Sequence, residues 1–226
     1  MVKFEQAYWY THVCPLRKIE KKLFPEKENA LIIRKYIHTA VLSLFKNYQK
    51  DLVKDVLPLL DIKRLKRGIN SATITKQVHK ALINIGIWRV KHQDEEILLQ
   101  DFSKEVEGMS INIDIARLKS NMRQTQLIWF RYDFLMPSLS DFAKLVERAQ
   151  WNARGYELLS GNRPMQLTYY FPVLGVEYSV LYNTEGKYEV IADLINKGVY
   201  PMQPSLACDY CTECPMSWVG YKGELK

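Results

Sequence analysis

The spacing of apolar residues changes partway along the chain. In the first hundred residues, apolar side chains recur at the three- and four-residue intervals of helices, and we expect helices over Leu31–Phe45, Leu52–Leu65 and Thr75–Val90. Farther on, apolar positions alternate or form short β-rich runs. The pattern therefore predicts a helical part over about residues 25–100 and an α/β core over about residues 101–200.

The second part of the pattern predicts several strands and one long helix. Ser138 opens a capping box, Ser-Leu-Ser-Asp, for a helix that runs to about Leu159, and a short helix is expected over Asp193–Lys197. No repeat and no clear linker interrupts residues 1–226, so we expect a single α/β domain. The expected strands are Glu105–Leu118, Gln126–Phe134, Gln166–Tyr170, Val176–Tyr182 and Lys187–Ile191.

Composition narrows the class of protein. Hydrophobic residues make up 47% and charged residues 25%, the balance of a folded protein with a real core. No run of 18 apolar residues occurs and the first residues do not resemble a secretory signal, so we expect a cytoplasmic protein without a membrane partner. The net charge of +7 permits DNA or RNA as a partner without requiring either.

The four cysteines are the most specific feature of the sequence. Cys208, Cys211 and Cys214 form a Cys-x2-Cys-x2-Cys run, and Cys14 lies near the start of the chain. Because thiols inside cells stay reduced, cysteines this close together indicate a metal site rather than disulfides. Four thiolates suit either Zn²⁺ or a [4Fe–4S] cluster, and the spacing alone leaves both open.

The segment Cys14-Pro15-Leu16-Arg17-Lys18, which follows Tyr8-Trp9-Tyr10, resembles the opening of RecB-like PD-(D/E)XK nucleases that carry an iron–sulfur staple. These include the AddB nuclease domain and the CRISPR-associated RecB-like exonucleases. The resemblance implies a mixed β-sheet flanked by helices, with an N-terminal helical insertion and a metal-stapled tail at residues 201–226. It implies that Cys14 joins the three C-terminal cysteines around a [4Fe–4S] cluster. The family's last gap is usually longer than that between Cys211 and Cys214, which keeps Zn as the alternative.

The resemblance also assigns positions in the middle of the chain. His38 stands where the family has a helical active-site histidine, and Asp114 resembles the strand aspartate that binds Mg²⁺ or Mn²⁺. The helix after the next strand normally holds Gln-x3-Tyr, and this chain has Gln150 with Arg154 at the tyrosine position. Gln150 and Arg154 are therefore expected to contact nucleic acid.

The strand after Asp114 departs from the family. It should carry a carboxylate, one residue, and then lysine, but this chain has Trp129 and Arg131 at those positions. Arginine stays protonated and cannot act as a base, although it binds phosphate well. If the strand continues, Asp133 lies on the same face and could supply the missing carboxylate; alternatively, it pairs with Arg131.

These observations favour a nucleic-acid-binding protein on a RecB-like nuclease scaffold with an impaired catalytic centre. It would act in DNA processing, such as recombination, repair or phage biology, with DNA and a protein complex as partners. One alternative is an active metal-dependent DNA exonuclease that uses Asp114 and Asp133, assisted by His38 and Arg131. Another is a protein-interaction module whose basic surface meets an acidic partner.

Overall fold

The computed structural model describes part of the chain. Helical residues occur between residues 30 and 42, where the sequence predicts a helix. The predicted helix Leu52–Leu65 and all four cysteines lie outside the described residues. The described residues are 2–4, 6–8, 30–31, 33–34, 37–39, 41–42, 71–93, 95–119, 124–183 and 187–198.

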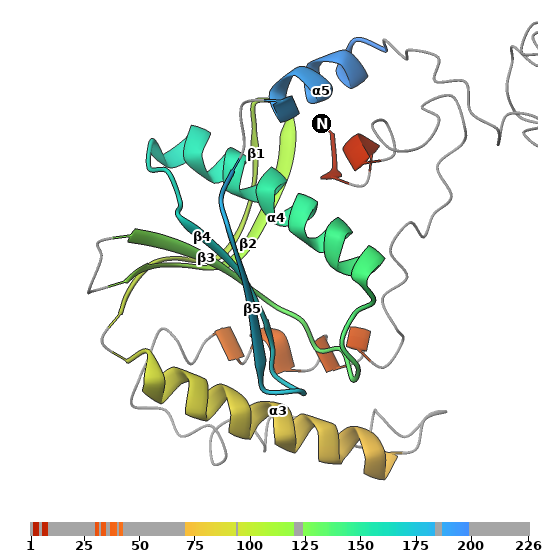
Figure 1. The fold of residues 1–226 in the computed structure, drawn as a ribbon, viewed down its shortest axis with the longest axis vertical. Helices are drawn as coiled ribbons and strands as arrows, with labels where there is room; N and C mark the ends of the chain where they lie inside the picture. The colour runs from red at the N-terminus through yellow and green to blue at the C-terminus, as the bar shows by residue number, and fades with distance from the viewer. Residues whose placement is uncertain are drawn as a thin grey trace, which may run out of the picture.

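A mixed sheet of five strands forms the centre of the described fold, in the order β1-β2-β3-β4-β5 (Figure 1). Neighbouring strands are antiparallel except β3 and β4, which are parallel and are connected through helix α4 (Leu139–Ser160). The predicted α/β class, with a mixed sheet flanked by helices, is confirmed. The strands are β1 (Glu96–Val106), β2 (Met109–Lys119), β3 (Gln124–Phe130), β4 (Gln166–Phe171) and β5 (Val176–Leu181).

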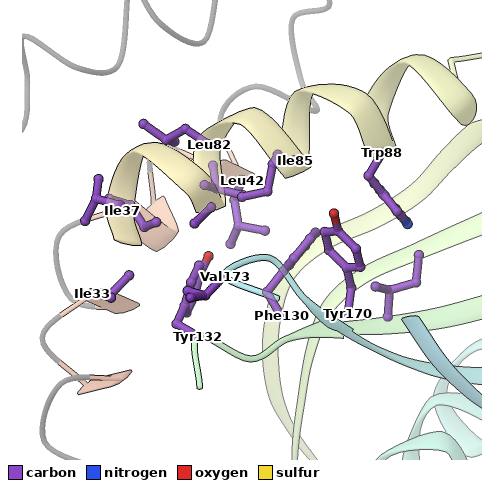
Figure 2. Close-up of a cluster of buried hydrophobic side chains, with 14 of the residues drawn as sticks. Ile33, Ile37, Leu42, Leu82, Ile85, Trp88, Phe130, Tyr132, Tyr170 and Val173 are labelled. Atoms are coloured by element: carbon purple, nitrogen blue, oxygen red, sulfur yellow. The ribbon is translucent and has the colours of Figure 1, made fainter. Parts of the chain in front are cut away.

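Helix α3 (Ser71–Lys91) covers one face of the sheet, at the bottom of Figure 1. Its buried side chains, among them Leu82, Ile85 and Trp88, point toward Phe130 and Tyr170 of the sheet (Figure 2). This burial follows from the helical period of the sequence, which gathers apolar residues on one stripe. The prediction of a helix over Thr75–Val90 is confirmed, and the helix begins four residues earlier.

Helix α4 packs on the opposite face of the sheet. Ser138 is its N-cap and accepts a hydrogen bond from the backbone N–H of Asp141, so the predicted start of the helix is confirmed. Gly161 ends the helix with a φ of 70°. The helix lies very close to β2 at Gly155, where an added Cβ would stand 2.3 Å from Cγ2 of Ile111. Glycine is therefore required at this contact.

The β1–β2 hairpin differs from the sequence prediction. A two-residue turn at Glu107 and Gly108, with φ of 47° and 75°, divides what the sequence predicts as one strand over Glu105–Leu118. Strand β1 also begins at Glu96, inside the part predicted to be helical. Its alternation was hidden by an irregular pairing at Ile97–Leu99 and by the positive φ of Asp101, which shift side chains between faces.

The segment predicted as a strand over Lys187–Ile191 is helical and belongs to α5 (Lys187–Asn196). Tyr188 and Ala192, one helical turn apart, pack against Trp151 and residues near the N-terminus. The five-residue segment, in which Tyr188, Val190 and Ile191 favour strands, was too short to reveal the helical period, and tertiary packing decided the structure. None of the helices in the described segments is long and apolar enough to span a bilayer.

Candidate functional site: a cleft where the sheet opens

The sheet opens between β2 and β3. Regular pairing of these strands runs as far as Ile115 opposite Ile128, whereas β3 continues to Phe130 on its other side, paired with β4. Beyond Ile128, a side chain takes the place of a strand partner: Asp114 Oδ2 accepts a 2.7 Å hydrogen bond from the backbone N–H of Phe130. Because backbone polar groups must be satisfied when buried, this side chain stabilises the end of the ladder.

Two further side chains complete the opening. Arg34 Nη1 donates to the carbonyl of Phe130 at 3.2 Å, and the indole N–H of Trp129 donates to the carbonyl of Asn112 at 2.7 Å. Trp129 is therefore fixed in place, 7% exposed, with its ring tilted against Tyr169 at a centroid distance of 5.4 Å. The position where the sequence resemblance implies a carboxylate holds an indole ring whose N–H bonds the backbone.

A cleft of about 320 Å³ lies at this opening. Its lining carries three arginines, Arg34, Arg131 and Arg148, and two carboxylates, Asp101 and Asp114. The sequence did not single out three of these charged groups, Arg34, Arg148 and Asp101. Arg34 and Arg131 also bond Asp114 and Asp133. Three guanidinium groups in one cleft suit an anionic ligand, because each has five donors and can bind phosphate or carboxylate oxygens bidentately.

Asp114 and His38 come together as the resemblance implies. Oδ1 of Asp114 lies 3.2 Å from His38 Nε2 and 3.4 Å from Arg34 Nη2. His38 Nδ1 lies 3.1 Å from the hydroxyl of Tyr132. Burial, and then the negative charge of Asp114, raises the pKa of Tyr132 well above its ordinary value. The phenol of Tyr132 thus stays protonated beside the imidazole ring.

Asp133 does not join this cluster. Strand β3 ends at Phe130, four residues before the predicted end at Phe134, so strand alternation does not carry Asp133 to the face of Trp129. Asp133 instead accepts a 2.9 Å hydrogen bond from Arg131 Nε and lines with it a small hollow of about 10 Å³ beside the cleft. The ion pair, the second of the two roles expected for Asp133, is the one that the structure contains.

Gln150 and Arg154 lie away from the cleft. Gln150 donates to the carbonyl of Leu181 at 2.9 Å and accepts from the backbone N–H of Asn183 at 3.0 Å. Its side chain therefore fixes α4 to the end of β5. The expected contacts of Gln150 with nucleic acid are not supported by this placement.

Arg154 has a structural environment as well. It donates to Glu157 at 2.7 Å and to Glu189 of α5 at 2.6 Å, and these carboxylates raise its pKa further above the ordinary value of arginine. Both bonds are charge-assisted and join α4 to α5. A nucleic-acid phosphate would have to compete with two carboxylates for this guanidinium, so the expected role of Arg154 is not supported either.

Arg148 and Asn152 are the residues of α4 that reach the cleft. They lie four positions apart on one helical face, and Asn152 accepts a 2.8 Å hydrogen bond from the backbone N–H of Asn112. Burial raises the pKa of the neighbouring Tyr169 to about 12, and the charges of Arg148 and Arg131 oppose that rise. Both arginines thus act electrostatically at the same site. On α4, the cleft-facing pair Arg148 and Asn152 lies two residues before the expected pair Gln150 and Arg154.

The described residues do not provide a multidentate metal site. Within these segments, no three His, Cys, Asp or Glu side chains gather closely enough to hold an ion. Asp114 has Arg34 beside it, and both of its oxygens already have partners. The four cysteines lie outside the described residues, so their predicted site stays a prediction.

Comparison with known proteins gives little further guidance. No protein-family model matches the chain, and no curated protein matches it in sequence. Nine chains of solved structures match, among them the crystal structure of SSO0001, which is 14% identical and covers 83% of this chain and 95% of its own. Its TM-score is 0.30, a value too low to support an argument about fold or function.

Proposed function

We propose that the chain binds nucleic acid in the arginine-lined cleft beside Asp114. The observation that carries this proposal is the convergence of Arg34, Arg131 and Arg148 on one cleft at a break in the sheet. Phosphate contacts supply most of the affinity of a protein for nucleic acid, and arginine is well suited to make them. DNA is the proposed partner, and DNA processing is the proposed setting.

The proposed scaffold is that of the RecB-like PD-(D/E)XK nucleases. In support, a helical segment bearing His38 precedes the strand with Asp114, the next strand ends near Trp129, and helix α4 follows. This is the order that the sequence resemblance implies. The 3.2 Å approach of His38 to Asp114 brings together two positions that the resemblance assigns to one site.

The proposed catalytic centre is impaired. Hydrolysis of a phosphodiester generally needs a divalent ion held by carboxylates and water. The described side chains do not fit such an ion: Asp114 is bonded to a backbone N–H and lies beside two nitrogen groups, and Trp129 offers no oxygen. Arg131 is a permanent cation and cannot activate water as a base. These features favour holding nucleic acid over cutting it.

We further propose that Cys14, Cys208, Cys211 and Cys214 hold one [4Fe–4S] cluster, with Zn²⁺ as the alternative. This part rests on the sequence pattern. Anaerobically purified protein should be brown and contain about four irons per chain. Stoichiometric zinc without iron would show that the site holds zinc rather than a cluster. Purified protein that contains neither metal would contradict the proposed site.

Binding in the cleft is tested by fluorescence anisotropy with labelled single-stranded and duplex DNA over a range of salt concentrations. Arg148→Ala should raise the Kd about tenfold and reduce the salt slope by about one, because one phosphate contact is lost. Arg163→Ala is the matched control: Arg163 is exposed, packs over Tyr182, and is not among the residues that line the cleft. Equal losses of DNA affinity in both variants would show that DNA does not bind in the cleft.

A nuclease assay with Mn²⁺ on end-labelled DNA tests the impaired centre. Wild type should cleave poorly or not at all, and the double change Trp129→Glu, Arg131→Lys should raise cleavage. Robust wild-type cleavage that disappears in both Asp114→Ala and Asp133→Ala would establish the exonuclease alternative. An absence of salt-dependent DNA binding would leave the interaction module as the remaining function.

A further inference from the structure

The outer face of α3 carries an exposed apolar stripe. Ile83, Ile87 and Val90 are 57%, 59% and 67% exposed. They are four and three positions apart, so they lie along one side of the helix. The opposite side of α3 carries the buried residues that pack on the sheet, among them Ile85 and Trp88 (Figure 2). The helical period therefore directs the stripe away from the core.

The position of α3 does not depend on this stripe. Asn84 donates to the carbonyl of Pro172 at 2.8 Å, and the hydroxyl of Tyr170 donates to the carbonyl of Asn84 at 2.9 Å. Gly175, with a φ of 72°, lets the β4–β5 turn approach the Asn84 side chain closely. The helix is therefore fixed on its inner side, and its outer isoleucines are presented on a rigid element.

The border of the stripe is basic. Lys76, Lys80 and Lys91 are exposed on the same helix, and α3 contains no aspartate or glutamate from residue 71 to residue 91. An apolar row beside lysines, without acidic residues on the helix, is complementary to an amphipathic surface of negative charge. Two copies of this helix facing each other would bring lysines together, which disfavours self-association.

We propose that the outer face of α3 docks an acidic amphipathic helix of a partner protein. The apolar row of the partner would cover Ile83, Ile87 and Val90, while its carboxylates would face Lys80 and Lys91. This surface is separate from the cleft, none of whose lining residues belongs to α3. It would let the chain join a protein complex while the cleft stays open.

The test uses a labelled synthetic helical peptide with leucines three and four positions apart and glutamates beside them. Full-length protein should bind it with a Kd of about 10 μM, as expected for a small interface. Ile87→Glu should weaken binding at least about tenfold, because it places a charge at the centre of the contact. It should leave the thermal melt unchanged, because the side chain is 59% exposed.

A charge reversal supplies the matched control. Lys80→Glu should weaken binding of the acidic peptide and strengthen binding of a peptide with lysines in place of the glutamates. Lys104→Glu changes the net charge equally but lies on β1, and it should leave binding of the acidic peptide unchanged. If Lys80→Glu and Lys104→Glu weaken binding of the acidic peptide equally, the peptide responds only to the net charge of the protein, and the proposal is overturned.

Other occupants of this face would also overturn the proposal, and each has its own readout. Dimerisation in sedimentation that Ile87→Glu abolishes would identify a second copy. Flotation with anionic vesicles, but no binding of the acidic peptide, would identify a lipid surface. A photo-reactive residue at position 87 that attaches to residues 43–70 of the same chain would identify an internal cover.

Discussion

Strand β2 buries two charged side chains three positions apart, Arg117 and Asp114, and their surroundings differ sharply. Arg117 lies where pairing with β3 is regular, opposite Gln126. It is 1% exposed, forms an ion pair with Glu95 at 2.6 Å, and lies 4.6 Å from the ring of Trp88. Asp114 lies one residue beyond the last regular β2–β3 pair and borders a cleft.

The two environments show what a continuous ladder does to polar side chains. Around Arg117 the backbone is satisfied by strand pairing, so side chains bond one another: Gln126 accepts from Arg117 and donates to Thr168, which bonds Ser179. This row of side-chain bonds crosses the sheet from β2 to β5. At Asp114 one carboxylate oxygen bonds the backbone N–H of Phe130, the other lies near His38 and Arg34, and the residue borders the cleft.

The largest expected loss of stability comes from the buried cluster of Arg117, Glu95 and Gln126, here called the closed cluster. Arg117→Leu should lower the free energy of unfolding by about 3–5 kcal/mol, because the Glu95 carboxylate, 14% exposed, would lose its guanidinium partner and keep only the contact with His92. Urea unfolding measures this loss, and DNA binding by the folded fraction should not change. Adding Glu95→Gln to this variant should recover part of the loss, since the buried charge is then removed. A loss below about 1 kcal/mol in the single variant would mean that Glu95 reaches water.

A smaller loss of stability, with an added loss of binding, is expected at the contact of α4 with β2. Gly155→Ala should cost about 1–3 kcal/mol, because its Cβ would overlap Ile111 and push the helix outward. That shift also moves Arg148 and Asn152, so DNA affinity should fall. If the variant melts like the wild type and binds DNA equally well, the close approach of α4 is not needed for the cleft.

The cluster of Asp114, His38 and Arg34 beside the cleft is the open cluster. Asp114→Asn should change its charge and lower the free energy of unfolding by only about 1 kcal/mol. The amide keeps an oxygen for the backbone N–H of Phe130 but removes a negative charge beside Arg34. DNA affinity should therefore rise about threefold to tenfold at low salt, as measured by anisotropy. Weaker binding would instead indicate that Asp114 holds the ligand through a metal ion.

The smallest effect concerns pH at the edge of the closed cluster. Burial, and then the charge of Arg117, lowers the pKa of His92 from 6.5, while Glu95 and Glu177 oppose the shift. The unfolded chain thus binds a proton more readily than the folded protein, so stability is greatest above pH 6.5 and falls as the pH decreases below it. His92→Gln should reduce the slope of melting temperature against pH in this range. If the slope of melting temperature against pH does not change in His92→Gln, groups other than His92 cause the loss of stability in acid.

The sequence predicted part of this arrangement. It placed His38, Asp114 and Arg131 in one site, and the structure brings His38 to Asp114 and Arg131 to the same cleft. It did not identify Arg34, Arg148 or Asn152. Periodicity shows which face of an element is buried, but not which backbone groups lack a strand partner, and that shortage is what recruits these side chains.

Other differences have equally local causes. The role of Asp133 depended on how far β3 extends, and strand ends are set by pairing rather than by composition. Gln150 and Arg154 followed a family motif whose register differs by two residues from the cleft-facing pair in this helix. A shift of two positions on a helix turns a side chain to a different face.

The turn at Glu107 and Gly108 bears on the order in which the molecule assembles. Its two positive φ angles suit the twist of a tight hairpin, so β1 and β2, adjacent in sequence, can pair within microseconds. The parallel pairing of β3 with β4 requires the chain between them to fold back first, which is slower. The cleft takes Asp101 from the hairpin and Tyr169 from β4. A nascent chain that has not yet paired β4 would therefore carry a formed hairpin and no binding surface, and recognition would begin only with the last strand contacts.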